Sequence, residues 1–394
     1  MKRREILAGA TAMTLLSAVR PGMAQDGAQD GVLKLGLIVP MTGPFATYGQ
    51  QMDIGTRMYL DEHGDSVAGR RVQITLADDG GVADTSKRIA QEMITRQGVE
   101  VLAGFGLTPL AMAVGPLSAR ARVPQLVLVA ATSAVTEQSP YIVRLSYTTP
   151  QVTSQIAKWV TAQGITRAAT LVTDYGPGLD AERTFTADFT AAGGEIVESL
   201  RVPLQNPEFA PFLQRVADRA PQALFVFVPT GLGTPLLRQF VERGLDKAGI
   251  QLIADGSTTD DLVLPEMGDA AIGMVTGFHY SASHDSELNR RFVAEYMRRS
   301  RGVRPSFIAV AAYDAMHMLY EGLRKTGGDA SGPAFTDAVR GMEWESPRGP
   351  IGIDPETRDI VQNIYMRRVE KIDGQLWNTE FETYESVRDP GKAG

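Results

Sequence analysis

The 394-residue sequence contains no cysteine and only four histidines. The absence of cysteine excludes disulfide bonds, thiolate metal sites and cysteine nucleophiles, and four histidines leave little material for a histidine metal cluster. Positive charge is also in deficit, with 39 lysines and arginines against 46 aspartates and glutamates and a net charge of −7. Because nucleic-acid binding requires an excess of cations, this balance argues against a nucleic-acid partner.

Long apolar runs are missing after the first 24 residues. Three basic residues at positions 2–4 precede a mostly apolar stretch at 6–19, and small residues at 22 and 24 suit a signal peptidase. The stretch is shorter than the ~18–20 residues that span a bilayer. We therefore predict an export signal at 1–24, removed near Ala24, with a frayed helix or a membrane anchor as the alternative. The pair Arg3-Arg4 resembles a twin-arginine signal, and the general export route stays open.

From residue 32 onward, short apolar strands alternate with helical patterns. Strands are predicted at 33–39, 71–76, 101–104 and 125–129, and the alternation restarts after Tyr141. A second series of strands is expected at 168–172 and near Glu195, Ala223 and Gln251, and antiparallel strands close the chain at 349–353, 360–370 and 375–384. Alternating strands and helices indicate parallel sheets covered by helices on both faces. The predicted fold class is α/β, with two doubly wound lobes.

Catalytic signatures are absent from the loops after these strands, where an open parallel sheet binds its ligands. Gly104 and Gly106 begin a pattern like a dinucleotide fingerprint, but Pro109 stands at its third glycine position. The sequence also lacks a phosphate-binding loop and a serine nucleophile elbow in the required context. We therefore expect no catalytic residue, no cofactor and no metal. A secreted enzyme remains the alternative.

The same loops are instead rich in small, hydroxylated and aromatic residues. Hydroxyl groups and free N–H groups at helix N-termini can bind a carboxylate without the help of a positively charged side chain. Aromatic rings such as those of Phe45, Tyr48 and Tyr175 can wall an apolar group. Together the loops predict a pocket for a small molecule that is partly polar and partly apolar. They span residues 42–49, 107–109, 130–133, 173–178, 229–231 and 254–257.

Several of these segments resemble those of the periplasmic leucine/isoleucine/valine-type binding proteins, the branched-chain amino acid family of receptors for ABC importers. Residues 34–44 read KLGLIVPMTGP, and further matches are AAT at 130–132, DYGPG at 174–178 and GDAAIG at 268–273. The resemblance covers about residues 32–388. It implies the type I periplasmic binding protein fold, with two lobes joined by three crossovers near 147–150, 274–277 and 347–355. Lobe 1 would then comprise 32–147 and 277–348, and lobe 2 would comprise 150–274 and 355–388.

The resemblance also implies a binding site. Its carboxylate-binding positions match Thr108, Ala130 and Thr132, and its two aromatic positions match Tyr48 in lobe 1 and Tyr175 in lobe 2. The sequence departs from the family at two further positions. The second aromatic of lobe 2 is missing around Thr230, and the only acid near the ammonium-binding position is Asp255. The expected ligand-binding residues are Tyr48, Thr108, Ala130, Thr132, Tyr175, Thr230 and Asp255.

The function that the resemblance implies is the periplasmic solute-binding component of an ABC importer. We expect this protein to capture a small amino acid of the branched-chain type by hinge closure, and to deliver it to membrane permease subunits as a monomer. If Asp255 does not reach the ligand, an aromatic or aliphatic carboxylate or a short amide fits better, because a buried ammonium would lack its partner. A ligand sensor for a membrane receptor is a further alternative.

Overall fold

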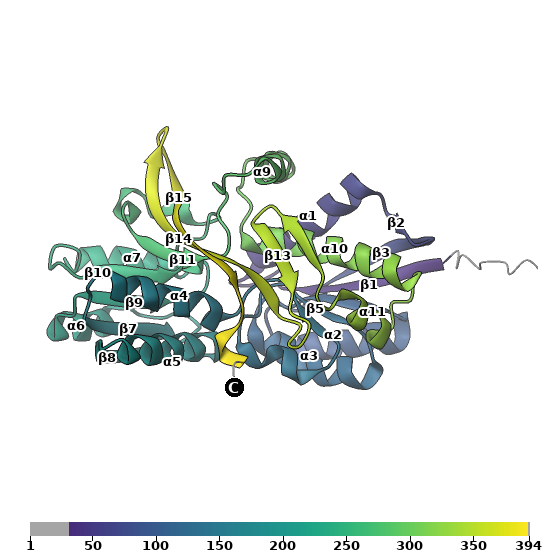
Figure 1. Cartoon of the computed structure of the whole chain (residues 1–394), viewed down its shortest axis with the longest axis horizontal. Coiled ribbons are helices and arrows are strands. Elements are labelled where there is room, and N and C mark those ends of the chain that lie inside the picture. The colour runs from purple at the N-terminus through teal and green to yellow at the C-terminus, as the bar shows by residue number, and fades with distance from the viewer. Residues whose placement is uncertain (1–30, 393–394) are drawn as a thin grey trace, which may run out of the picture.

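The computed structural model describes residues 31–392 (Figure 1). The export signal predicted at 1–24 lies outside the described residues. Within residues 31–392, no helix is both long and apolar enough to cross a membrane.

The first lobe is built on a six-stranded sheet with the order β2-β3-β1-β4-β5-β6. All its pairings are parallel except that of the two-residue edge strand β2. Its strands are β1 (Gly31–Val39), β2 (Ser66–Val67), β3 (Arg70–Asp78), β4 (Val101–Gly104), β5 (Gln125–Val127) and β6 (Ile142–Arg144). The helices of this lobe are α1 (Ala46–His63), α2 (Ala83–Glu92), α3 (Thr108–Ala121), α9 (Glu287–Arg299), α10 (Phe307–Thr326) and α11 (Gly332–Val339).

The second lobe is built on a nine-stranded sheet with the order β12-β13-β14-β11-β10-β9-β7-β8, and β15 pairs with β14. Its parallel strands are β7 (Arg167–Thr173), β8 (Glu195–Val202), β9 (Ala223–Phe227), β10 (Gln251–Asp255) and β11 (Val275–Phe278). Its antiparallel strands are β12 (Glu343–Ser346), β13 (Gly349–Ile353), β14 (Ile360–Ile372) and β15 (Gln375–Val387). The helices are α4 (Thr149–Ala162), α5 (Gly176–Ala191), α6 (Ala210–Arg219), α7 (Gly233–Glu242) and the short α8 (Leu264–Met267). The two lobes lie side by side, with lobe 2 on the left of Figure 1.

The predicted α/β class with two parallel-sheet lobes is confirmed, and most of the predicted strands lie within a few residues of their predicted positions. Six strands and helices were not predicted: β2, β6, β11, β12, α8 and α11. β11 is hard to recognise because it contains a glycine, Gly277, which is untypical of a strand. The close packing of α4 requires this glycine, since a Cβ there would lie 2.5 Å from Ile156 Cγ1. β12 falls in a range predicted for lobe 1, yet it pairs with β13 of the larger sheet.

The crossovers between the lobes are tied together by buried side chains. Arg348, just before β13, donates from Nη1 to Ser146 O at 3.2 Å, in the crossover between β6 and α4. Its Nη2 forms a 2.8 Å ion pair with Asp314 Oδ2 on α10. Gln362 on β14 also donates to Ser146 O, at 2.9 Å. One guanidinium therefore connects two crossovers to the core of lobe 1.

A second set of interlobe contacts, which we call the clasp, lies between α10 and β15. Arg304, just before α10, donates from Nη1 to Leu376 O at 2.6 Å and from Nη2 to Gln375 Oε1 at 2.7 Å. Its guanidinium lies 3.5 Å from the ring centroid of Trp377. These contacts hold a segment of lobe 1 directly against the β14–β15 hairpin of lobe 2.

Candidate ligand-binding site

A small cavity lies between the two lobes, where the carboxyl ends of strands from both sheets converge. This is the position at which open parallel sheets bind ligands. The chain segments after β4 and β5 border it from lobe 1, and those after β7, β9 and β10 border it from lobe 2. It is lined by Tyr48, Gly106, Leu107, Thr108, Val129, Ala130, Ala131, Tyr147, Tyr175, Pro177, Phe227, Pro229, Ser257 and Phe307.

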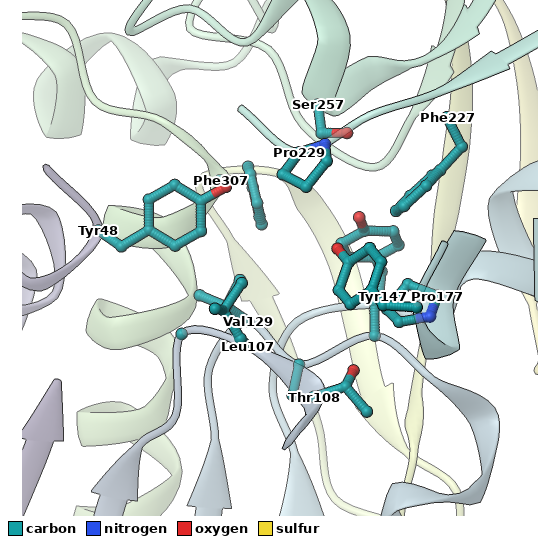
Figure 2. Close-up of a pocket in the computed structure, with 14 residues that line it drawn as sticks. Tyr48, Leu107, Thr108, Val129, Tyr147, Pro177, Phe227, Pro229, Ser257 and Phe307 are labelled. Atoms are coloured by element: carbon teal, nitrogen blue, oxygen red, sulfur yellow. The ribbon is translucent and has the colours of Figure 1, made fainter. Parts of the chain in front are cut away.

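Aromatic rings form the walls of the cavity (Figure 2). Tyr48 comes from α1, Phe307 from the start of α10, and Tyr147 from the first crossover. Tyr175 and Phe227 come from lobe 2, and their ring centroids are 6.2 Å apart at an angle of 35°. The rings of Tyr147 and Phe307 meet edge to face at 5.7 Å. The walls therefore suit a flat apolar group, which both lobes would contact.

One end of the cavity lies at the N-terminus of α3. Thr108 is the first residue of that helix, and its Oγ1 accepts hydrogen bonds from Thr132 N at 3.3 Å and Thr132 Oγ1 at 3.1 Å. Ala130 also lines this end, and its carbonyl accepts a hydrogen bond from Arg144 Nη1 at 2.5 Å. A helix N-terminus with an adjacent hydroxyl favours an anion through the helix dipole.

Ser257 lies at the opposite side of the cavity from Thr108 (Figure 2). Its backbone N–H donates to Asp255 Oδ1 at 2.9 Å, and its hydroxyl donates to the same oxygen at 2.6 Å or to Val228 O at 2.9 Å. Asp255 is fully buried behind Ser257 and does not line the cavity. Thr230 is also behind this end, where its Oγ1 donates to Ser257 O at 3.3 Å.

The charges near this end are all one layer behind the cavity surface. Burial raises the pKa of Asp255 to about 6, and the positive charge of Arg367 opposes that rise. Burial also raises the pKa values of the Tyr147 and Tyr175 hydroxyls well above their usual value, so both remain neutral. None of the fourteen lining residues carries a charge, and the site therefore offers dipoles and hydroxyl groups to a ligand.

Four of the seven residues expected to bind ligand line the cavity: Tyr48, Thr108, Ala130 and Tyr175. The other three, Thr132, Thr230 and Asp255, are buried directly behind lining residues. That these seven residues bind ligand stays a prediction.

The aromatic and hydroxyl side chains of Tyr147, Phe227, Ser257 and Phe307 also line the cavity and were not among the predicted site residues. Ser257 belongs to the predicted loop 254–257, and Phe227 lies two residues before the predicted loop 229–231. Tyr147 and Phe307 carry no local signal, because their place in the site depends on how the crossovers pack.

Asp260, close to this end of the cavity, gives the protein a pH-dependent stability. Burial and the neighbouring charge of Asp261 raise its pKa to about 8, while Arg367 opposes the rise. Because the folded state holds this proton more tightly than the unfolded state does, the contribution of Asp260 to the free energy of unfolding falls as pH rises from about 4 to about 8.

Replacement of Asp260 with asparagine should remove this penalty. Asparagine can keep the hydrogen bond that Asp260 Oδ1 accepts from Leu262 N. We expect Asp260→Asn to raise Tm at pH 8 by about 3 °C or more, and to leave Tm at pH 4 nearly unchanged. Differential scanning calorimetry at both pH values checks this, with the exposed Asp246→Asn as the matched control. An equal shift at both pH values would contradict the assignment.

Comparison with known proteins places this architecture in a family. The family model described as "Periplasmic binding protein" matches residues 32–375. Leu/Ile/Val-binding protein homolog 6 of Brucella abortus is 44% identical over 374 residues, which cover 94% of this chain and 96% of the relative. The chain therefore belongs to the periplasmic binding protein family, and it has the substrate-binding role and the type I fold of the leucine/isoleucine/valine-type members.

Solved structures give the same result. A solute-binding protein of an ABC transporter from Rhodopseudomonas palustris BisB5, in complex with 3,4-dihydroxybenzoic acid, is 54% identical with a TM-score of 0.89. That match covers 92% of this chain and 99% of the other. A second solute-binding protein, from R. palustris HaA2 in complex with p-hydroxybenzoic acid, is 40% identical, with a TM-score of 0.89 and the same coverage.

Proposed function

We propose that this protein is the periplasmic component of an ABC importer that captures a hydroxylated aromatic carboxylate and delivers it unchanged to membrane permease subunits. The observation that carries the proposal is the cavity itself: flat aromatic walls, an anion-favouring helix N-terminus at one end and a hydroxyl group at the other, with no charged residue among those that line it. The export signal predicted at 1–24 supports the periplasmic location.

The carboxylate of such a ligand would be bound at the N-terminus of α3. Thr108 and the neighbouring backbone provide polar groups there, and the helix dipole favours the negative charge without a cationic side chain. The relatives support this ligand class, since the 54% and 40% identical structures hold dihydroxy- and hydroxybenzoic acids and a 25% identical structure from R. palustris holds benzoate.

The ring would be bound between Tyr48 of lobe 1 and Tyr175 and Phe227 of lobe 2. Because these residues come from both lobes, a ligand that contacts all of them favours the closed arrangement over an open one. A dissociation constant of 1 μM corresponds to about −8 kcal/mol, which ring burial and several charge-assisted hydrogen bonds can supply. Binding and release then require only hinge motion, and the protein would not alter the ligand chemically.

A branched-chain amino acid is the second candidate, and the names of the 44% identical relatives favour it. An amino acid carries an ammonium group, which needs a carboxylate partner when it is buried. Asp255, the acid near the family's ammonium-binding position, does not line the cavity, and its pKa is raised to about 6 by burial. These two observations make the aromatic acid the better fit.

A binding panel tests the proposal. Thermal shift and titration calorimetry would compare 3,4-dihydroxybenzoate, 4-hydroxybenzoate, benzoate and leucine. A ligand at 100 times its dissociation constant adds about 2.7 kcal/mol of stability, which raises Tm by about 3 °C. We expect this shift for the hydroxybenzoates and none for leucine, with the bound compound recovered unchanged by mass spectrometry. A shift with leucine alone, or a chemically altered compound, would overturn the proposal.

A further inference from the structure

The hydroxyl of Ser257 is held in a hydrogen-bonding arrangement that determines what it can offer to a ligand. Ser257 lies at the start of the short 3₁₀ helix Gly256–Thr259, and Asp255 caps that helix by accepting from Ser257 N at 2.9 Å. The Oγ atom is within 2.6 Å of Asp255 Oδ1 and 2.9 Å of Val228 O. Both neighbours are acceptors, so the single hydroxyl proton is directed to one of them.

Ser257 therefore presents only its lone pairs to the cavity. Whichever acceptor receives the proton, the remaining capacity of Oγ is to accept a hydrogen bond. Asp255 adds to this acceptor character, because its Oδ2 is buried and has no hydrogen-bond partner within residues 31–392. A ligand atom at this end of the cavity must donate a hydrogen bond, and a second anionic group would be repelled by Asp255.

The position of Ser257 specifies which part of the ligand it would contact. Thr108 and Ser257 lie at opposite sides of the cavity, with the aromatic walls between them (Figure 2). A carboxylate at Thr108 and a group at Ser257 must therefore be separated by the ring. In an α-amino acid a single carbon separates the ammonium group from the carboxylate, so the two groups cannot lie at opposite ends of the cavity. A hydroxyl group across the ring from the carboxylate can lie at Ser257 while the carboxylate lies at Thr108.

On the basis of the proposed function, we infer that Ser257 is the specificity-determining residue for a ring hydroxyl, and that Asp255 is its positioning residue. Ser257 accepts a hydrogen bond from the hydroxyl group that lies across the ring from the carboxylate. An analogue without a donor gives Ser257 Oγ no hydrogen bond from the ligand and leaves it beside only the Tyr147 hydroxyl. A site built to pair a hydroxyl group discriminates strongly against ligands that lack it.

The experiment compares 4-hydroxybenzoate with 4-fluorobenzoate by titration calorimetry. The two share the ring and the carboxylate, but only the first has a donor. The wild-type protein is expected to bind 4-hydroxybenzoate about tenfold or more tightly. In Ser257→Ala this preference should fall to about threefold or less, mostly through weaker binding of 4-hydroxybenzoate. Ser199→Ala, which changes an exposed serine on β8, is the matched control and should keep the full preference.

Asp255→Ala tests the positioning role. Alanine removes both hydrogen bonds that Asp255 Oδ1 accepts from Ser257, from N at 2.9 Å and from Oγ at 2.6 Å, so the hydroxyl group is no longer held in place. The preference for 4-hydroxybenzoate should decrease, while 4-fluorobenzoate binds as in the wild-type protein. If Asp255 had a purely structural role, its substitution would weaken the binding of both ligands equally.

The wild-type protein alone provides a second test in case these variants do not fold. 4-Aminobenzoate, which has a donor, should bind more tightly than benzoate and 4-fluorobenzoate, which have none. If no aromatic acid binds, the proposed function fails. If aromatic acids bind but donors give no advantage, or Ser257→Ala keeps the full preference, the inference about Ser257 is overturned while the proposed function stands.

Discussion

Replacement of Arg348 with methionine is expected to lower the free energy of unfolding by about 3–5 kcal/mol, since it removes one partner of a fully buried ion pair. The Arg348 and Asp314 side chains are 0% and 1% exposed, and Nη2 lies 2.8 Å from Oδ2. The variant leaves a buried carboxylate whose remaining partners are the neutral donors Ser346 and Trp344. It also leaves the carbonyl groups of the first crossover, at Leu145 and Ser146, without the guanidinium.

Urea denaturation measures this loss. Arg291→Met is the control, because its ion pair with Glu287 is exposed and long, at 3.9 Å. Such pairs contribute about 0–1 kcal/mol. The double variant Arg348→Met/Asp314→Asn should recover part of the stability, since no unpaired charge then remains. A loss below about 1 kcal/mol in Arg348→Met would contradict the structural role given to this residue.

Replacement of Gly176 with valine is expected to weaken ligand binding by about a hundredfold or more, because it opposes lobe closure. Gly176 begins α5 in lobe 2, and a Cβ at this position would lie 2.4 Å from Thr132 Oγ1 in lobe 1. Gly176 does not have a positive φ, so its backbone tolerates a side chain. The obstruction arises only when the lobes meet, and Tm without ligand should change little. Calorimetry with 4-hydroxybenzoate and small-angle scattering measure affinity and closure.

A matched series tests whether this contact is the cause. Gly176→Ala should weaken binding less than the valine variant does. Without Thr132 Oγ1, the nearest atom to the added Cβ is Thr108 Cγ2 at 3.4 Å, an ordinary contact. The double variant Gly176→Ala/Thr132→Ala should therefore bind as tightly as Thr132→Ala alone. If Gly176→Val binds at wild-type affinity, the lobes do not close through this contact.

The sequence predicts most of the fold because apolar strands and helical patterns are local properties. β9 is buried throughout, and β1 ends in a buried run over residues 35–39, so both are easy to recognise. β6 and β11 are only three and four residues long, and they form strands because neighbouring strands pair with them. Their formation depends on tertiary contacts that the local pattern does not contain.

Prediction of the site has a similar limit. Tyr48, Thr108 and Tyr175 could be chosen because each follows a strand of a recognised lobe. Phe307 lies far from them in the sequence, and only the packing of α10 against α1 brings it to the cavity. Asp255 was predicted to bind ligand as the single nearby acid, whereas in the structure Ser257 lies between Asp255 and the cavity. Which of two residues in the same turn faces a cavity depends on local backbone geometry.

The clasp formed by Arg304 with Gln375, Leu376 and Trp377 has a consequence for the affinity of the whole molecule. None of these four residues lines the cavity, and their contacts join the two lobes away from the ligand. Apparent affinity scales with the fraction of molecules already in the competent conformation. Substitutions in the clasp would therefore change the affinity for every solute by a common factor. The order of affinities among solutes would stay the same.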